Sequence, residues 1–107
     1  MRAAVYRTQG AAHEVLRVED VDTPEPGPGQ VRVRLRVAGV NPTDWKSRAN
    51  PAMPMVGPAQ TPGQDGAGEI DAVGEGVDPS RIGERVWVFH CARGSVHGSA
   101  AQYTVVP

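Results

Sequence analysis

The sequence predicts a mainly β fold, and three observations support this class. Gly and Pro are abundant, with 13 and 10 among 107 residues, and both disfavour long helices because Pro removes a hydrogen-bond donor and Gly carries an entropic cost. From Val31 to Val37, Val or Leu alternates with Arg, and a period of two residues indicates a strand with one buried face. The length suits one domain, residues 1–107, in which no repeat or linker is visible.

The other elements follow from alternation and from the positions of Gly and Pro. Strands are expected over residues 2–7, 14–21, 31–37, 66–74, 85–90 and 98–106. Loops or turns are expected over residues 23–30, 51–63 and 74–79. One helix is expected to begin at Asn41, which can cap free amides, with Pro42 at the first helical position, and to stop before Pro51. Together these elements predict a small irregular β-barrel with one short helix.

Charge and cysteine content argue against several functions. Eleven basic and twelve acidic residues give a net charge of −1, so bulk electrostatics does not favour nucleic acid as a partner. The Arg32, Arg34 and Arg36 stripe lacks interleaved aromatics and fits the wet face of a strand better than a base-stacking surface. Cys91 is the only cysteine, so no intramolecular disulfide indicates an oxidising compartment. No apolar run suits a membrane span or a secretory signal, and a cytoplasmic protein without a membrane partner is expected.

Short motifs also follow one another along nearly the whole chain. They read M-R-A-A-V at 1–5, P-E-P-G-P-G-Q-V at 24–31, A-G-V-N-P-T-D-W at 38–45, P-G-Q-D-G-A-G-E-I at 62–70, V-G-E-G-V at 73–77, G-E-R-V at 83–86 and A-A-Q-Y at 100–103. In this order they resemble the N-terminal, substrate-side domain of zinc-free medium-chain dehydrogenases/reductases of the NADPH-dependent quinone oxidoreductase type. That domain is a chaperonin-10-like (GroES-like) β-barrel, which agrees with the fold expected from spacing alone.

The resemblance implies that no zinc is bound. Zinc-dependent members carry a Cys-His pair where this chain has Asn41, and Gly-His-Glu where it has Gln64 and Asp65. Catalytic zinc requires three ligands drawn from Cys, His and carboxylate positions, and Asn and Gln are poor ligands. One further group of potential ligands is better explained as a polar hairpin than as a metal site: His90, Cys91 and His97.

The nucleotide-binding half of such an enzyme is not expected within these residues. A dinucleotide-binding fold needs G-x-G-x-x-G between a strand and a helix, and the G-x-G pairs that begin at Gly27, Gly66 and Gly74 lack the third glycine. The resemblance therefore implies that a Rossmann domain follows Pro107 and provides most of the NADPH site. It also implies a homo-oligomer for the full-length protein and an inactive fragment when this domain stands alone.

The resemblance also supplies candidate site residues. In the family, the segment that matches 41–46 lies beside the nicotinamide, which implies cofactor contacts from Asn41, Pro42, Thr43, Asp44, Trp45 and Lys46. Hydride transfer needs donors aimed at the oxygen where negative charge develops, so Lys46 and Arg48 are the candidate catalytic residues. Each candidate has a structural alternative: Asn41 as a helix cap, Trp45 as a core or interface aromatic, and the two cations as solvated charges. Gln64 and Asp65 are expected to hold a strand entry through hydrogen bonds.

The expected function is zinc-independent hydride transfer from NADPH to a small-molecule quinone or enone. Two alternatives stay open: an enoyl or alkenal reductase of the same superfamily, and a standalone chaperonin-10-like binding module without catalysis.

Overall fold

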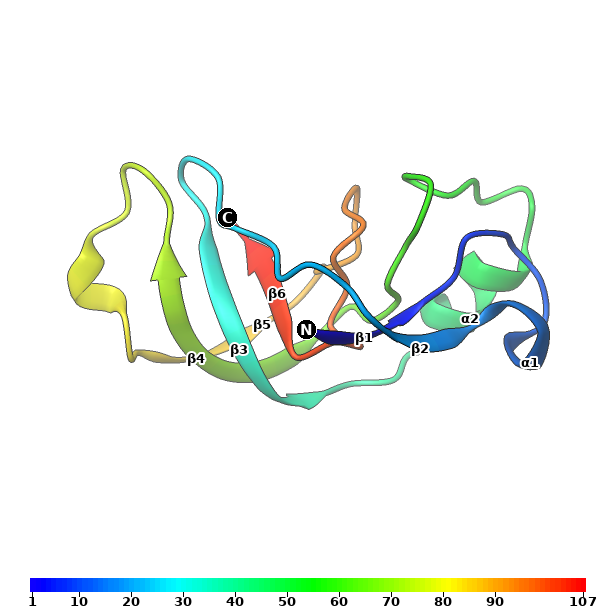
Figure 1. The fold of residues 1–107 in the computed structure, drawn as a ribbon, viewed down its shortest axis with the longest axis horizontal. Coiled ribbons are helices and arrows are strands. Elements are labelled where there is room, and N and C mark those ends of the chain that lie inside the picture. The colour runs from blue at the N-terminus through cyan, green and yellow to red at the C-terminus, as the bar shows by residue number, and fades with distance from the viewer.

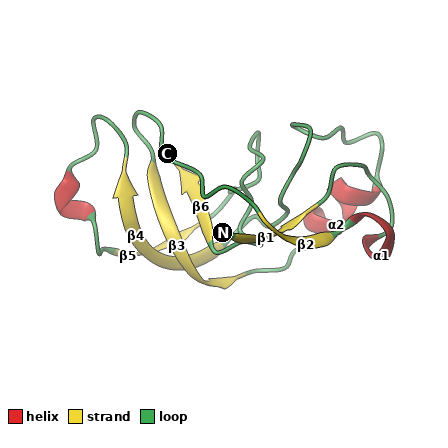
Figure 2. Cartoon of the chain, viewed as in Figure 1, coloured by secondary structure: helices red, strands yellow, loops and turns green.

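Two antiparallel sheets and three short helical segments make up the computed structural model, which describes residues 1–107 (Figures 1 and 2). The strands are β1 (Arg2–Val5), β2 (Arg17–Asp20), β3 (Val31–Ala38), β4 (Gly66–Val73), β5 (Arg85–Val88) and β6 (Tyr103–Val106). The helical segments are α1 (Ala12–Val15), α2 (Pro42–Ala49) and a 3-10 turn, η1 (Pro79–Arg81). The predicted mainly β class is confirmed. None of the helices has the length and apolar character that crossing a membrane requires.

The larger sheet has the strand order β5-β4-β3-β6, and all its neighbours are antiparallel. The predicted alternation of β3 places Val31 and Val33 in the buried core, where they cluster with Ile70, Val88 and Cys91. Val37 was expected on the same face but is 62% exposed. The reason is that β6 pairs with β3 only as far as Arg34, so the end of β3 lacks a neighbour on that side.

The smaller sheet pairs β1 with β2. It lies between the larger sheet and the helices α1 and α2 (Figure 1). The molecule measures 42 × 24 × 23 Å, with the four-stranded sheet toward one end and α1 and α2 at the other (Figure 1). Single bridges connect the parts, pairing Ala3 with Ala101 and Tyr6 with Gln60. Further backbone hydrogen bonds join the loop before β4 to the segment before β6. The helix α2 itself contains no buried residue.

Four predicted strands are wrong in extent. The strand expected over residues 2–7 ends at Val5, after which Tyr6 makes only a single bridge to Gln60. Residues 14 and 15 belong to the single turn α1 because β1 offers only four residues for pairing, and the register ends at Val5 opposite Arg17. β5 ends at Val88, two residues early, just before His90 takes a positive φ of 56°. β6 begins only at Tyr103, because the amides of residues 98–100 bond instead to the carbonyls of residues 61–63. The single predicted helix is α2; α1 and η1 are additional.

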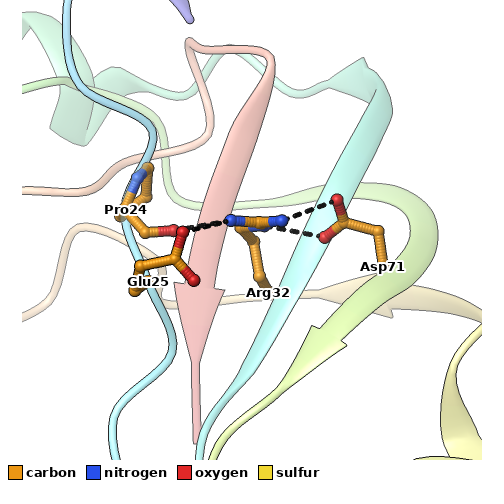
Figure 3. Close-up of polar contacts among 4 residues, drawn as sticks. All are labelled: Pro24, Glu25, Arg32 and Asp71. Carbon is orange, nitrogen blue, oxygen red and sulfur yellow. Dashed lines mark hydrogen bonds and ion pairs between the residues drawn. The ribbon is translucent and has the colours of Figure 1, made fainter.

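Arg32 connects three parts of the sheet end (Figure 3). Its guanidinium makes a forked contact to Asp71 on β4, with N···O distances of 2.9 and 3.1 Å, and reaches Glu25 (3.0 Å) and the Pro24 carbonyl (3.3 Å) in the Pro-Gly loop. It also lies 5.3 Å from the ring centroid of Tyr103 on β6. With only 16% of its side chain exposed, this arginine of the predicted wet face links β3, β4, β6 and the loop.

Candidate functional site

The start of α2 is fixed by the Asp44 carboxylate. Asp44 Oδ2 accepts from the backbone N–H of Asn41 at 2.7 Å, which satisfies a donor at the helix start in the manner of a capping box. Its other oxygen accepts from the Gly63 N–H at 3.2 Å. Asp44 thus joins the first turn of α2 to the segment that leads into β4, and both of its oxygens are used.

The Asn41 side chain contacts the segment before β4 as well, at Asp65. Asn41 Nδ2 donates to Asp65 Oδ1 at 2.5 Å, and both side chains are half-buried. The Gly39 N–H adds a bond to the Asp65 carbonyl at 2.9 Å. A Cβ at Gly39 would collide with the Asp65 carboxylate, so glycine is needed here for the carboxylate to approach the backbone.

A depression of about 720 Å³ lies between the first turns of α2, the 64–65 segment and the loop after β5. Its lining residues are Asn41, Pro42, Thr43, Ser47, Gln64, Asp65, Phe89, His90, Ala92 and Arg93. Small-molecule sites have volumes of roughly 300–1,000 Å³ and carry a few polar groups that fix orientation. The depression has this size, its lining is mostly polar, and it is open to solvent on one side.

The structure brings together three of the six cofactor-contact candidates: Asn41, Pro42 and Thr43 line the depression. Asp44 supports them through its two hydrogen bonds. Trp45 is 56% exposed and does not line the depression. The roles of these residues toward a cofactor stay predictions.

The two candidate catalytic residues, Lys46 and Arg48, are also absent from the lining. Lys46 is exposed, and its Nζ lies 5.8 Å from the ring centroid of Trp45. Arg48 Nη1 donates to the Gly10 carbonyl at 2.6 Å, while the Gly10 N–H donates to the Arg48 carbonyl at 3.0 Å. In this chain Arg48 therefore joins α2 to the segment before α1, and a catalytic role for either residue stays a prediction.

Sequence reasoning missed the contribution of the loop after β5. Phe89, His90 and Arg93 line the depression from the side opposite α2. The loop is held by the Cys91 N–H, which donates to the Gln64 carbonyl at 2.9 Å. A positive φ at a non-glycine residue such as His90 is uncommon and tends to occur at functional sites. Only the presence of Gly94 in this polar segment indicated a tight turn.

The side chain of Gln64 does not make the hydrogen bonds that were expected to hold the strand entry. Asp65 does hold the strand entry by hydrogen bonds, but the Gln64 side chain makes none, and its Oε1 is fully buried without a partner. No signal in the sequence distinguishes the two neighbours in this respect.

The cysteine and histidines of the same region lie too far apart to form a cluster of three potential metal ligands. No group of three or more His, Cys, Asp or Glu side chains converges as metal ligands would. Cys91 is buried, and burial raises the pKa of its thiol. His97 is half-buried, and burial lowers the pKa of its imidazole.

Comparison with known proteins agrees with this fold and site. The family described as the alcohol dehydrogenase GroES-like domain matches residues 27–107. The chain belongs to this family, the barrel domain of the medium-chain dehydrogenases/reductases.

Its curated relatives include oxidoreductases of several kinds. The chain is 34% identical to an alcohol dehydrogenase of a Moraxella species over 98% of this chain and 37% of that protein. It is 38% identical to a quinone oxidoreductase of Rattus norvegicus over 76% of this chain and 25% of that protein. It is 37% identical to a trans-enoyl reductase of Gibberella fujikuroi over 98% of this chain and 30% of that protein. The chain thus spans roughly a third of the length of such relatives.

Solved structures agree with the sequence relatives. A mycobacterial quinone oxidoreductase superposes with a TM-score of 0.81 at 28% identity, over 100% of this chain and 31% of that one. An NAD-dependent alcohol dehydrogenase gives a TM-score of 0.83 at 38% identity, over 100% and 37% respectively. The GroES-like fold is therefore shown by both sequence and structure.

Proposed function

We propose that this chain is the substrate-side domain of a zinc-independent, NADPH-dependent reductase of quinones or enones. The observation that carries the proposal is the 2.5 Å hydrogen bond from Asn41 to Asp65 on the wall of the depression. It lies where the zinc-dependent branch of the family has metal ligands.

The chemistry of these side chains argues for hydride transfer without zinc. Catalytic zinc takes three protein ligands from Cys, His and carboxylates. Here the Asn41 amide nitrogen is used as a donor to Asp65, so this carboxylate is engaged by a hydrogen bond. Gln64, the third residue at this place, offers a neutral amide. The donor set suits the binding of an organic ligand by hydrogen bonds better than it suits a divalent cation.

The depression fits a nicotinamide nucleotide in size and polarity. Its volume of about 720 Å³ accommodates a nicotinamide ring with its ribose and leaves room for a small acceptor. Thr43 and Gln64 line it and make no side-chain hydrogen bonds within the chain, so both can bond a carboxamide or a hydroxyl. When bound, NADPH supplies a hydride, which carries two electrons and one proton to the acceptor.

The residues of this chain would act by binding and orienting the acceptor. Asp65 fixes the direction of the Asn41 amide, and Asp44 fixes the helix turn that presents Pro42 and Thr43. Phe89 supplies an apolar wall from the opposite side. No nucleophile from the protein is needed, and the second proton of the reduction comes from solvent.

The relatives support the proposed cofactor and acceptors. Quinone oxidoreductases occur among both the sequence and the structural relatives, and one structural neighbour, a mycobacterial protein with a TM-score of 0.81, was solved in complex with NADPH. The trans-enoyl reductase relative keeps reduction of a conjugated double bond as the second candidate activity.

The test is an assay of the intact natural gene product, with its mass determined first. We expect NADPH oxidation in the presence of duroquinone or of a conjugated enal, and we expect the rate to survive treatment with a strong chelator. Loss of activity on chelation, restored by zinc, would contradict the metal-free mechanism. A product that binds no NADPH and has a mass near 11.3 kDa would instead support the standalone binding module.

A further inference from the structure

Gln64 occupies the inner wall of the depression, between α2 and the loop after β5. Its backbone carbonyl holds the Cys91 N–H at 2.9 Å, which fixes its position against that loop. Its side chain is half-buried, whereas Thr43, His90 and Arg93 on the same lining are exposed. Gln64 is therefore a polar side chain of the depression that is both shielded from solvent and free of any bond within the chain.

A second, smaller cavity also borders Gln64. This cavity has a volume of about 30 Å³, and its lining includes Tyr6, Ser47, Gln60 and Gln64. A polar cavity of this size has room for one water, which needs two to four polar partners. The buried Gln64 Oε1 is an acceptor without a partner.

Tyr6 also lines this cavity; it is 1% exposed, and burial raises the pKa of its phenol. The Gln64 amide oxygen is fully buried, whereas Nε2 makes no hydrogen bond within the chain and is not fully buried. Nε2 is therefore the end of the amide that a ligand in the depression can reach.

We propose that the Gln64 amide N–H binds the reacting oxygen of the substrate. This inference rests on the proposed function and deepens it. Hydride addition to a quinone or enone places negative charge on the carbonyl oxygen, and a donor fixed in advance and shielded from water stabilises that charge. The neighbouring amide of Asn41 already gives one of its two N–H groups to Asp65.

The step leaves Gln64 chemically unchanged. A carbon conjugated with the carbonyl gains the hydride with its electron pair, the π electrons shift to the carbonyl oxygen, and the oxygen takes a proton from solvent. In a quinone, loss of the added hydrogen from the ring carbon as a proton and protonation of the second oxygen then give the hydroquinone, and NADPH becomes NADP⁺. The amide only donates a hydrogen bond while the charge forms.

The experiment uses the intact protein and the substitution Gln64→Met, which keeps the length of the side chain and removes both N–H donors. The rate of hydride transfer to duroquinone is measured in a single turnover from bound NADPH. We expect it to fall about 100-fold, the usual effect of removing one such donor, with NADPH affinity unchanged. Gln102→Met, at an exposed position outside the depression, is the matched control and should react at the wild-type rate.

A second variant and a second readout separate this role from a structural one. Gln64→Glu keeps the shape but donates only when protonated, so its rate should recover as the pH falls. The carbonyl stretching frequency of bound duroquinone should be lower in the wild type than in Gln64→Met, because a hydrogen bond weakens the C=O bond. Wild-type rates and an unshifted carbonyl band in Gln64→Met would overturn the inference and leave the proposed function standing.

The experiment also separates the inference from a failure of the proposed function. If the wild type oxidises no NADPH with any acceptor, the proposed function fails, and the carbonyl band of bound duroquinone alone decides the inference. A band that shifts with Gln64 then supports carbonyl binding at this position, and a band that does not shift overturns it.

Discussion

The guanidinium of Arg32 and the amide of Gln64 are both shielded polar groups, yet they are bonded very differently. Arg32 contacts Asp71, Glu25 and the Pro24 carbonyl (Figure 3). Its guanidinium also lies 5.3 Å from the centroid of the Tyr103 ring. The side-chain amide of Gln64 makes no hydrogen bond within the chain.

The surroundings of Arg32 and Gln64 also differ in how much apolar side chain they bury. Five buried apolar residues form the core cluster of the larger sheet, whereas α2 has no buried residue and the side chains buried near it include Tyr6 and the polar Gln60. A buried polar group without a partner costs stability, and natural proteins keep such groups chiefly where a ligand or water will bond to them. The sheet end is thus built for stability, and the cleft end keeps hydrogen-bonding capacity for a ligand.

The largest loss of stability should follow from a substitution in the apolar core of the larger sheet. Ile70→Ala removes a side chain that is 1% exposed and leaves a cavity among tightly packed neighbours, so we expect a loss of about 3 kcal/mol in the free energy of unfolding. Val40→Ala, at a position 94% exposed near the start of α2, should change it by less than about 0.5 kcal/mol. Urea denaturation followed by circular dichroism measures both, and equal losses would contradict the proposed division.

The Arg32 contacts give the next largest effect. Arg32→Lys keeps the charge but loses the forked contact to Asp71 and the reach to Glu25, and we expect a cost of about 2 kcal/mol. The control is Arg36→Lys, since Arg36 pairs with Glu69 at 3.0 Å but is 57% exposed. Exposed ion pairs contribute little, so its cost should stay below about 0.5 kcal/mol. A similar urea midpoint for both variants would show that Arg32 does not unite the sheet end.

At the cleft end, Asn41→Asp should make stability depend on pH. The new carboxyl would face Asp65 at hydrogen-bonding distance, and two like charges raise the pKa of one member of such a pair in the folded state. A carboxyl whose folded pKa is raised stabilises the fold at low pH, and this stability is lost as the pH rises. We expect a free energy of unfolding about 1–2 kcal/mol lower at neutral pH than at mildly acidic pH. Asn50→Asp, at the exposed other end of α2, should lack this dependence.

The smallest expected effect concerns His97. Burial lowers the pKa of His97 below its usual value of 6.5, so the unfolded chain binds a proton more readily than the folded one. Stability is therefore present above pH 6.5 and declines as the pH falls below it. His97→Gln should flatten the stability profile between neutral pH and pH 5, whereas His13→Gln, on an 82% exposed side chain, should leave the slope unchanged.

Regular alternation predicted the fold best where the chain pairs on both sides. The strand at 31–37 was located almost to the residue, because β3 is flanked by β4 and β6 and its inward side chains must be apolar. The strand expected at 98–106 was too long, because residues 98–100 bond to a loop that lies nearly forty positions earlier in the chain. Local pattern contains no information about such distant partners.

The sequence predicted the part of the site that lies on a single segment, the start of α2. Asn41 and Pro42 mark a helix start by their residue types alone, and the structure places both at the depression. The loop at 89–93 and the unbonded amide of Gln64 were not predicted, because their roles depend on which segments fold against one another. Arg48 shows the converse, since its contact with Gly10 could not be inferred from its position on the helix.

The contacts near the two ends of the chain have a consequence for synthesis and folding. The Arg2 N–H donates to Gln102 across 100 positions, and Ala3 pairs with Ala101. β6 pairs with β3 at the far edge of the larger sheet. Contacts between distant positions slow folding because a long loop must close first. The edge of β3 that pairs with β6 therefore stays open until residues 103–106 are made, and until then the chain exposes apolar surface that chaperones would be expected to bind.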